Sequence, residues 1–107
     1  MNRYALAASL AALVMLPATA MAAGNPDKGM ALAREVCSAC HAVPPYENSI
    51  NPVSAAPDFK AIANMKGMNA TGLHAFLTTP HPTMPNLVLK PRQLSDVIAY
   101  ILSIRDI

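Results

Sequence analysis

Apolar residues recur at intervals of three or four positions in several separate stretches of the chain, and we find no strand pattern. The stretches with this helical spacing are residues 24–40, 57–65, 69–79 and 91–105. In the last of them the apolar positions are Leu94, Val97, Ile98, Ile101 and Leu102. Side chains at this spacing share one face of a helix. The pattern therefore predicts an all-α fold built from short helices.

Residues typical of helix ends support these boundaries. Asn25 can cap the first helix, and Pro26 suits its first position. Gly67 is expected to end the second helix, because glycine favours the left-handed backbone found after helix ends. Asn69 or Thr71 can start the third helix.

Two proline-rich stretches interrupt the helical pattern. Residues 42–57 contain four prolines, which are incompatible with a regular helix. An irregular loop of about 15 residues in a compact domain is usually functional or encloses a bound group. Residues 79–86 hold three prolines within six positions, with Met84 among them. We expect this second stretch to be a stiff, extended strap.

The N-terminus has the organisation of a secretory signal peptide. A short positive start is followed by the uncharged run Tyr4–Leu16 and by the small residues Ala20-Met21-Ala22. An uncleaved anchor would need about 20 apolar residues and would have to cross Pro17. We therefore expect a cleaved signal peptide at 1–22, a mature domain at 23–107, and no stable membrane insertion after cleavage.

The mature part is small and nearly neutral. It carries seven Lys or Arg and six Asp or Glu, so it offers no basic patch for nucleic acid. Its 85 residues are few for a self-sufficient core. Chains of this size usually need a disulfide, a structural metal or a cofactor for stability. The two cysteines lie too close together for a disulfide to close a useful loop.

The candidate chemistry is concentrated in Cys37-Ser38-Ala39-Cys40-His41. The two thiols are three positions apart, so one helical turn places them on the same side. They can bond to the two vinyl groups of one haem, and the adjacent histidine can bind its iron. The spacing is typical of c-type haem attachment, with a proximal histidine ligand.

A Cys-x-x-Cys pair has two other common uses. A thioredoxin-like dithiol would need a βαβ pattern, which the chain lacks. A zinc site could recruit His74 and His81, but their separation of seven positions falls outside the usual zinc-finger spacing. It would also leave His41 without a role.

A sixth iron ligand is expected from Met84. This methionine stands in the rigid strap between the last short helix and the C-terminal helix, so the strap can carry its thioether across the far face of a haem. The other candidates are Met30, Met65, Met68, His74 and His81. The three methionines are expected to fill the core, His74 to lie on the polar side of its helix, and His81 to be a partly exposed loop histidine.

With these motifs, residues 25–107 resemble the small class I cytochromes c of the bacterial periplasm. The most specific marks are the Cys37–His41 motif and Thr83-Met84-Pro85, and the strap resembles a proteobacterial subgroup. The resemblance implies that Gly29 and Tyr100 lie where the first and last helices cross. It also implies that the Pro57 carbonyl accepts a hydrogen bond from the axial imidazole, although Ala56 stands where the family usually has glycine.

The implied fold is the small cytochrome c fold, with about three to five short helices wrapped around one covalent haem c. Cys37 and Cys40 would hold the haem, and His41 and Met84 would be its axial iron ligands. Because both axial positions would be filled, we expect an electron carrier rather than an enzyme.

The expected carrier moves single electrons in the periplasm between a dehydrogenase donor and an oxidase or reductase acceptor. The alternative is the haem subunit of a periplasmic dehydrogenase complex, for example a sulfite dehydrogenase. A third class is a gas-binding or sensing cytochrome in which Met84 is labile.

Overall fold

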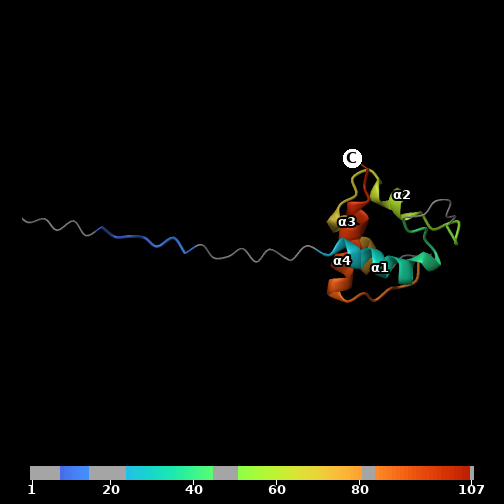
Figure 1. Ribbon diagram of the computed structural model, residues 1–107, viewed down its shortest axis with the longest axis horizontal. Helices are drawn as coiled ribbons and strands as arrows, with labels where there is room; N and C mark the ends of the chain where they lie inside the picture. The colour runs from blue at the N-terminus through green and yellow to red at the C-terminus, as the bar shows by residue number, and fades with distance from the viewer. Residues whose placement is uncertain (1–7, 15–23, 45–50, 81–83, 107) are drawn as a thin grey trace, which may run out of the picture.

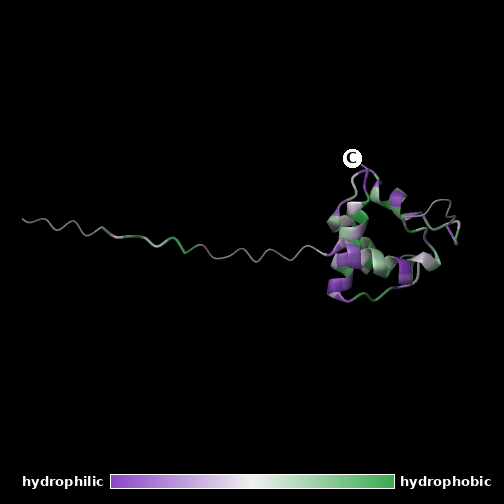
Figure 2. Cartoon of the chain, viewed as in Figure 1, coloured by the Kyte–Doolittle hydropathy of each residue, from purple (hydrophilic) through white to green (hydrophobic). Residues whose placement is uncertain are grey.

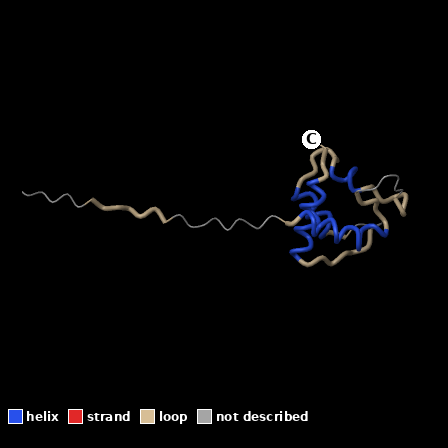
Figure 3. Tube along the Cα trace, viewed as in Figure 1, coloured by secondary structure: helices blue, strands red, loops and turns tan. Residues whose placement is uncertain are grey.

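The computed structural model describes residues 8–14, 24–44, 51–80 and 84–106. Its helices, labelled in Figure 1, are α1 (Pro26–Val36), η1 (Cys37–Ala39), α2 (Phe59–Ala63), α3 (Ala70–Thr78) and α4 (Pro91–Ser103), of which η1 is a short 3₁₀ helix. Within these described ranges no segment is drawn as a strand (Figure 3). The predicted all-α class is confirmed.

The helices begin where the capping residues predicted. The Asn25 side chain accepts hydrogen bonds from the backbone N–H groups of Asp27 and Lys28, at 2.9 and 3.1 Å. Asn69 caps α3 by accepting from the Gly72 N–H at 2.8 Å. The third helix therefore starts after Asn69 and not at Thr71.

The predicted ends were less accurate. We expected the second helix to reach Met65, but α2 ends at Ala63. Gly67 lies four residues beyond that end, with a φ of 78°. Glycine adopts this backbone conformation without strain, so Gly67 shapes the turn between α2 and α3 and does not terminate α2. The last helix ends at Ser103, two residues before the predicted Arg105.

Helices α1 and α4 cross one another, as Figure 1 shows, and their backbones approach closely at Gly29. A Cβ atom added to Gly29 would lie 1.9 Å from the Asp96 carbonyl oxygen and 2.8 Å from the Tyr100 Cβ. The predicted crossing is confirmed, but the nearest neighbour of Gly29 is the backbone of α4 at Asp96. Gly24 is equally close, because its added Cβ would lie 1.9 Å from the Ser95 carbonyl oxygen.

One apolar cluster joins all four α-helices. Its buried members are Ala33, Phe59, Ala63, Leu73, Val97, Tyr100 and Ile101. In the predicted stripe of α4, Leu94, Val97 and Ile101 are buried while Ile98 and Leu102 are half-buried. The hydrophilic start of α4 is purple at the lower left of the domain in Figure 2. The predicted amphipathic face of α4 is therefore the face that meets the core.

Polar contacts hold both ends of the domain. The buried Asp96 carboxylate accepts a hydrogen bond from the Asn25 N–H at 2.7 Å. At the other end, the Arg105 guanidinium donates to the Ala63 carbonyl at 2.9 Å and to the Met68 carbonyl. These bonds connect residues that are far apart in sequence, so they tie the start of α1 to α4, and the end of α4 to α2.

Residues 8–14 have no regular secondary structure. Their larger apolar side chains are almost fully exposed, with Leu10 at 92%. Among the described residues, no helix has the length and apolar character needed to cross a membrane. The expected cleavage position after Ala22 lies outside the described residues, so the signal peptide stays a prediction.

The close approach at Gly29 predicts that Gly29→Val destabilises the protein. The valine side chain would force α1 and α4 apart, which should cost about 1–3 kcal/mol of unfolding free energy by overpacking. The measurement is the denaturation midpoint of the haem-loaded protein.

Gly72→Ala is the matched control. An added Cβ at Gly72 would meet its nearest atoms at 3.5 Å, which is ordinary van der Waals contact. This variant should be neutral or more stable by about 0.5–1 kcal/mol, because alanine suits a helix better than glycine. Equal midpoints for Gly29→Val and the parent would place the tight contact elsewhere.

Candidate haem site

The Cys37–His41 motif folds as a tight turn at the end of α1. The N–H groups of Cys40 and His41 both donate to the Cys37 carbonyl, at 3.1 and 2.9 Å. Because side chains three positions apart eclipse one another in a 3₁₀ helix, this turn places the two cysteines on the same side. The motif lies at the end of the first helix, as predicted.

Both thiols are free and half-buried. Burial raises the pKa of the Cys37 thiol. Because the thiolate is the reactive form of a cysteine, this shift makes the free Cys37 thiol less reactive than an exposed one.

The His41 ring is held by the backbone of Pro57. Its Nδ1 atom lies 2.6 Å from the Pro57 carbonyl oxygen. A carbonyl oxygen can only accept a hydrogen bond, so Nδ1 must carry the proton. In the neutral imidazole, the other nitrogen, Nε2, then has a free lone pair, which is the arrangement of a histidine that ligates a metal. The hydrogen bond that the resemblance implied between Pro57 and His41 is confirmed.

The loop that carries Pro57 is fastened to the haem motif. The Ala42 N–H donates to the Asn51 side chain at 2.8 Å, and the Ala42 carbonyl accepts from the Phe59 N–H at 3.0 Å. The Ala56 N–H donates to the Val53 carbonyl at 3.0 Å, which closes a turn immediately before Pro57. Alanine at position 56 is therefore compatible with the local turn.

Aromatic rings support His41 from the core. The Phe59 ring lies edge-on to the imidazole, with ring centroids 5.5 Å apart, and it also lies 6.2 Å from the Tyr100 ring. Phe59 and Tyr100 are both buried. The imidazole is thus held by a hydrogen bond at one nitrogen and by ring packing along its edge.

The sequence predicted only a packing contact for Tyr100, at the crossing of the first and last helices. The hydrogen bond that its hydroxyl makes was not predicted. Its hydroxyl donates to the Pro44 carbonyl at 2.9 Å, and the Arg34 guanidinium approaches the same oxygen at 3.5 Å. The available signal was a tyrosine at a buried position, since a buried phenol usually finds a hydrogen-bond partner. This contact fastens the chain three residues after His41 to α4.

Met84 comes from the strap and is half-buried. It lines a cavity of about 210 Å³ together with Phe76 and Leu77 from the end of α3. Met84 and the apolar end of α3 therefore face the same cavity. Thr83 and His81 lie outside the described residues, so the expected position of His81 is untested.

The other candidate ligands occupy different surroundings. Met30 and Met68 are half-buried and pack against the core cluster, as predicted. Met65 was also expected in the core, but it is 53% exposed, because α2 ends before it. His74 is exposed on α3, as expected for the polar side of that helix.

The residues present fit a covalently bound haem. They supply two thiols on one side of a turn, an imidazole whose tautomer leaves Nε2 free, and a thioether in an apolar wall. Among the described residues, no group of three or more His, Cys, Asp or Glu is arranged to hold a metal ion. The zinc alternative would use His81, which lies outside the described residues, so the structure does not test it.

Comparison with known proteins agrees with this chemistry. The family model described as Cytochrome c matches residues 26–105, which include α1 to α4 and the loops between them. The chain belongs to the cytochrome c family. No curated protein and no solved structure matches it. Proteins of this family bind covalent haem c and carry electrons, so the cofactor of this chain is haem c and its role is haem-based electron transfer.

The bond between Tyr100 and Pro44 predicts a pH-dependent stability. Burial raises the pKa of the Tyr100 phenol, and the nearby Arg34 charge partly opposes this increase. A phenol with a raised pKa holds its proton more tightly in the folded state. Its stabilising contribution is complete below the unfolded pKa of about 10 and is lost as pH rises through the folded pKa.

Tyr100→Phe should remove this alkaline loss. At pH 7 the variant should be less stable by about 1 kcal/mol, because the Pro44 carbonyl loses its donor. Between about pH 10 and 12 its unfolding free energy should decline less steeply than that of the parent. Denaturant unfolding across this range measures both effects, and parallel curves would show that Tyr100 is not the titrating group.

Proposed function

We propose that this protein is a monohaem class I cytochrome c of the periplasm, with His41 and Met84 as axial ligands, which carries single electrons between redox partner proteins. The observation that carries the proposal is the 2.6 Å contact between His41 Nδ1 and the Pro57 carbonyl. It leaves Nε2 as an acceptor on the residue that directly follows Cys40.

Cys37 and Cys40 hold the haem in this proposal. Their thiols add to its two vinyl groups, and the turn that joins them sets the position of His41. Once bound, the haem supplies one-electron exchange between ferrous and ferric iron. The protein keeps the imidazole in one orientation through Pro57 and Phe59, so little has to rearrange when the oxidation state changes.

Met84 supplies the second axial ligand. Its half-buried position beside Phe76 and Leu77 supports this role. A thioether favours ferrous iron and raises the reduction potential compared with a second histidine. The apolar surroundings act in the same direction, because they disfavour the more highly charged ferric form. With both axial positions filled, no substrate reaches the iron.

A fixed haem subunit of a periplasmic dehydrogenase complex is the second candidate. The observation in its favour is the number of large apolar side chains on the surface of the helical domain, among them Phe76, Met65 and Val88, at 59, 53 and 97% exposure. Permanent interfaces are more apolar than transient ones. The small size and the near-neutral charge of the domain fit both candidates, so isolation of the native protein has to decide between them.

The first prediction concerns the axial methionine. In Met84→Ala the weak sulfur-to-iron band of the ferric protein should disappear, and the reduction potential should fall. The ferrous iron should then bind carbon monoxide. Met65→Ala, at an exposed position, is the control and should keep the band. A band that survives in Met84→Ala would show that another residue is the ligand, and carbon monoxide binding to the parent would indicate a labile Met84.

Export and haem attachment are tested by mass. Protein isolated from the periplasm of a producing cell should have the mass of residues 23–107 plus one haem, and the haem should survive acid–acetone extraction. Cys37→Ala should retain a single thioether at most. Retention of Met1 would exclude cleavage, and haem released by acid would exclude covalent attachment.

Isolation from its own cells separates the two candidate functions. A free carrier should elute alone at about 9–10 kDa, the size of an 85-residue domain by the usual mass per residue. A fixed subunit would instead remain with a larger dehydrogenase through salt washes. Substrate turnover by the purified cytochrome alone would contradict both candidates, because no free iron position is expected.

A further inference from the structure

The loop before α2 holds the backbone on both sides of His41. The carbonyl of the peptide unit between Cys40 and His41 accepts a hydrogen bond from the Val53 N–H, at 3.3 Å. The N–H of the next peptide unit, which belongs to Ala42, donates to the Asn51 side chain at 2.8 Å. Both peptide units that flank the His41 Cα atom are therefore bonded to one short segment of the loop. Because these two units determine the direction of the Cα–Cβ bond, the segment determines where the imidazole ring starts.

The two hydrogen bonds differ in how they depend on the sequence. The bond from Val53 uses a backbone N–H, which every residue except proline possesses. The bond to Asn51 uses a side-chain oxygen, so it depends on which residue stands at this position. Ala42 is buried, and a buried N–H that loses its acceptor is costly because water does not replace the lost bond. A substitution of Asn51 would thus release the peptide unit that follows His41.

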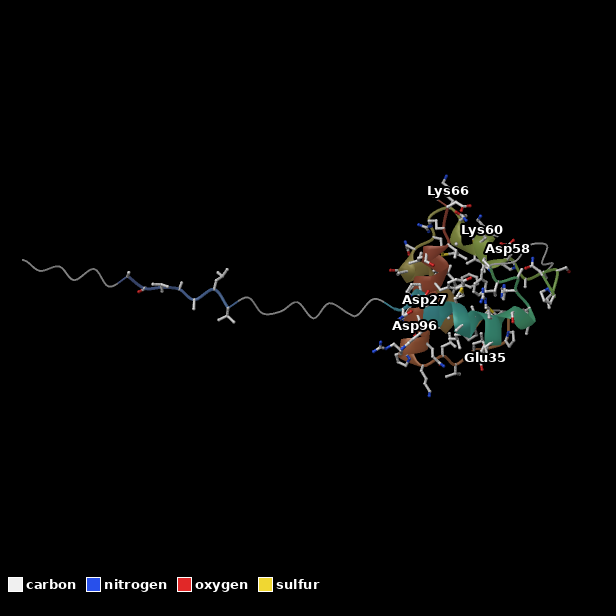
Figure 4. All side chains as sticks on the ribbon, in the orientation of Figure 1. Asp27, Glu35, Asp58, Lys60, Lys66 and Asp96 are labelled. Atoms are coloured by element: carbon white, nitrogen blue, oxygen red, sulfur yellow. The ribbon has the colours of Figure 1, made fainter. Side chains whose placement is uncertain are left out.

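The other end of this loop is fixed by α2. Asp58, labelled in Figure 4 where the loop enters the helix, caps α2 by accepting a backbone N–H hydrogen bond at 2.7 Å. The next residue, Phe59, donates its N–H to the Ala42 carbonyl at 3.0 Å. Pro57 directly precedes Asp58 in the chain. The Pro57 carbonyl is therefore held by α2 on one side and by the Asn51 bond on the other.

We propose that Asn51 is a positioning residue for the axial histidine, and that it lowers the reduction potential of the protein. By holding the peptide unit after His41 against the loop, its side chain keeps the hydrogen bond between the imidazole and the Pro57 carbonyl short. The inference rests on the proposed function, because it takes His41 as an iron ligand.

The effect on the potential follows from the hydrogen bond at Nδ1. A carbonyl that accepts from one imidazole nitrogen makes the other nitrogen a more basic ligand. A more basic ligand favours ferric iron, which carries the higher charge, so a tight bond between His41 and Pro57 lowers the potential. The Met84 thioether acts in the opposite direction. Asn51 thus limits, from the histidine side, the increase in potential that the methionine produces.

Asn51→Leu tests the proposal in the haem-loaded protein, because leucine has a similar size but no acceptor. In the ferrous state, the His41 Nδ1 proton should exchange with water about fivefold faster, the factor that one lost hydrogen bond is typically worth. NMR measures this exchange. The ratio of ferrous to ferric protein at a fixed ambient potential should rise about threefold, less than the about tenfold typical for removing an outer-shell partner itself. A substitution that merely admitted water to the haem would favour the ferric form and lower the potential.

Two further substitutions at the same position separate the lost acceptor from other effects. In Asn51→Asp, a carboxylate of the same shape still accepts from the Ala42 N–H, so the exchange of the Nδ1 proton should match that of the parent. Its negative charge favours ferric iron, so the potential should not rise. Asn51→Ala lacks the acceptor without the bulk of leucine and should behave like Asn51→Leu.

Asn25→Leu is the matched control. The Asn25 side chain also accepts a hydrogen bond from a backbone N–H, that of Asp27, at 2.9 Å. This bond lies at the opposite end of α1 from the cysteine–histidine motif, and Figure 4 labels Asp27 at that end and Glu35 near the other. Loss of the helix cap should lower the denaturation midpoint. The potential and the exchange of the Nδ1 proton should stay at the parent values, which separates positioning from a general loss of stability.

The parent protein supplies a further readout. Its Ala42 amide proton should be protected from exchange in the ferrous state, and Asn51→Leu should remove this protection. An unprotected Ala42 amide in the parent would overturn the proposal. The same conclusion would follow if Asn51→Leu and Asn51→Ala kept the parent potential, or if Asn25→Leu raised it equally. Failure of both acceptor-free variants to take up haem would assign Asn51 to attachment instead of positioning. A parent protein without a covalent haem would contradict the proposed function itself, which is a different result from a normal potential in the Asn51 variants.

Discussion

The close approach of α1 and α4 at Gly29 is the constraint on which the rest of this fold depends. Without a side chain at this position, α1 can lie against the backbone of α4 at Asp96. The Asp96 carboxylate also accepts the Asn25 N–H at the start of α1, at 2.7 Å. A buried carboxylate without a partner is costly. Sliding one helix along the other would therefore break this bond as well as the packing.

This crossing controls the haem site through Tyr100 and Phe59. Tyr100 lies one turn after Asp96, and its hydroxyl reaches the Pro44 carbonyl. Its ring packs against Phe59, which packs against His41. Tyr100 of α4 and Phe59 of α2 thus restrict the orientation of the imidazole. The Pro57 carbonyl determines that Nδ1 carries a proton. The cysteine–histidine motif alone would leave the orientation of the ring undetermined.

Local signals in the sequence predicted the helices and the haem motif well. The caps at Asn25 and Asn69 and the spacing of the cysteines involve residues within a few positions of one another. The prediction failed at the end of the second helix. This helix was expected to reach Met65 but ends at Ala63, so Met65 was wrongly expected in the core.

The contacts that could not be predicted connect distant parts of the chain. Arg105 bonds to the Ala63 carbonyl across 42 positions, and Tyr100 bonds to the Pro44 carbonyl across 56. Both acceptors are backbone carbonyls, which every residue possesses. The sequence therefore contains no partner residue that would reveal either bond, and only the folded backbone brings the groups together.

The composition of the core explains why so small a domain needs its cofactor. Among the described residues, three of the nine buried hydrophobic residues are alanines. Such small side chains let the helices approach closely, but they bury little apolar surface, and the stability of a domain depends on that surface. The haem adds a large apolar group that is bonded to the chain itself.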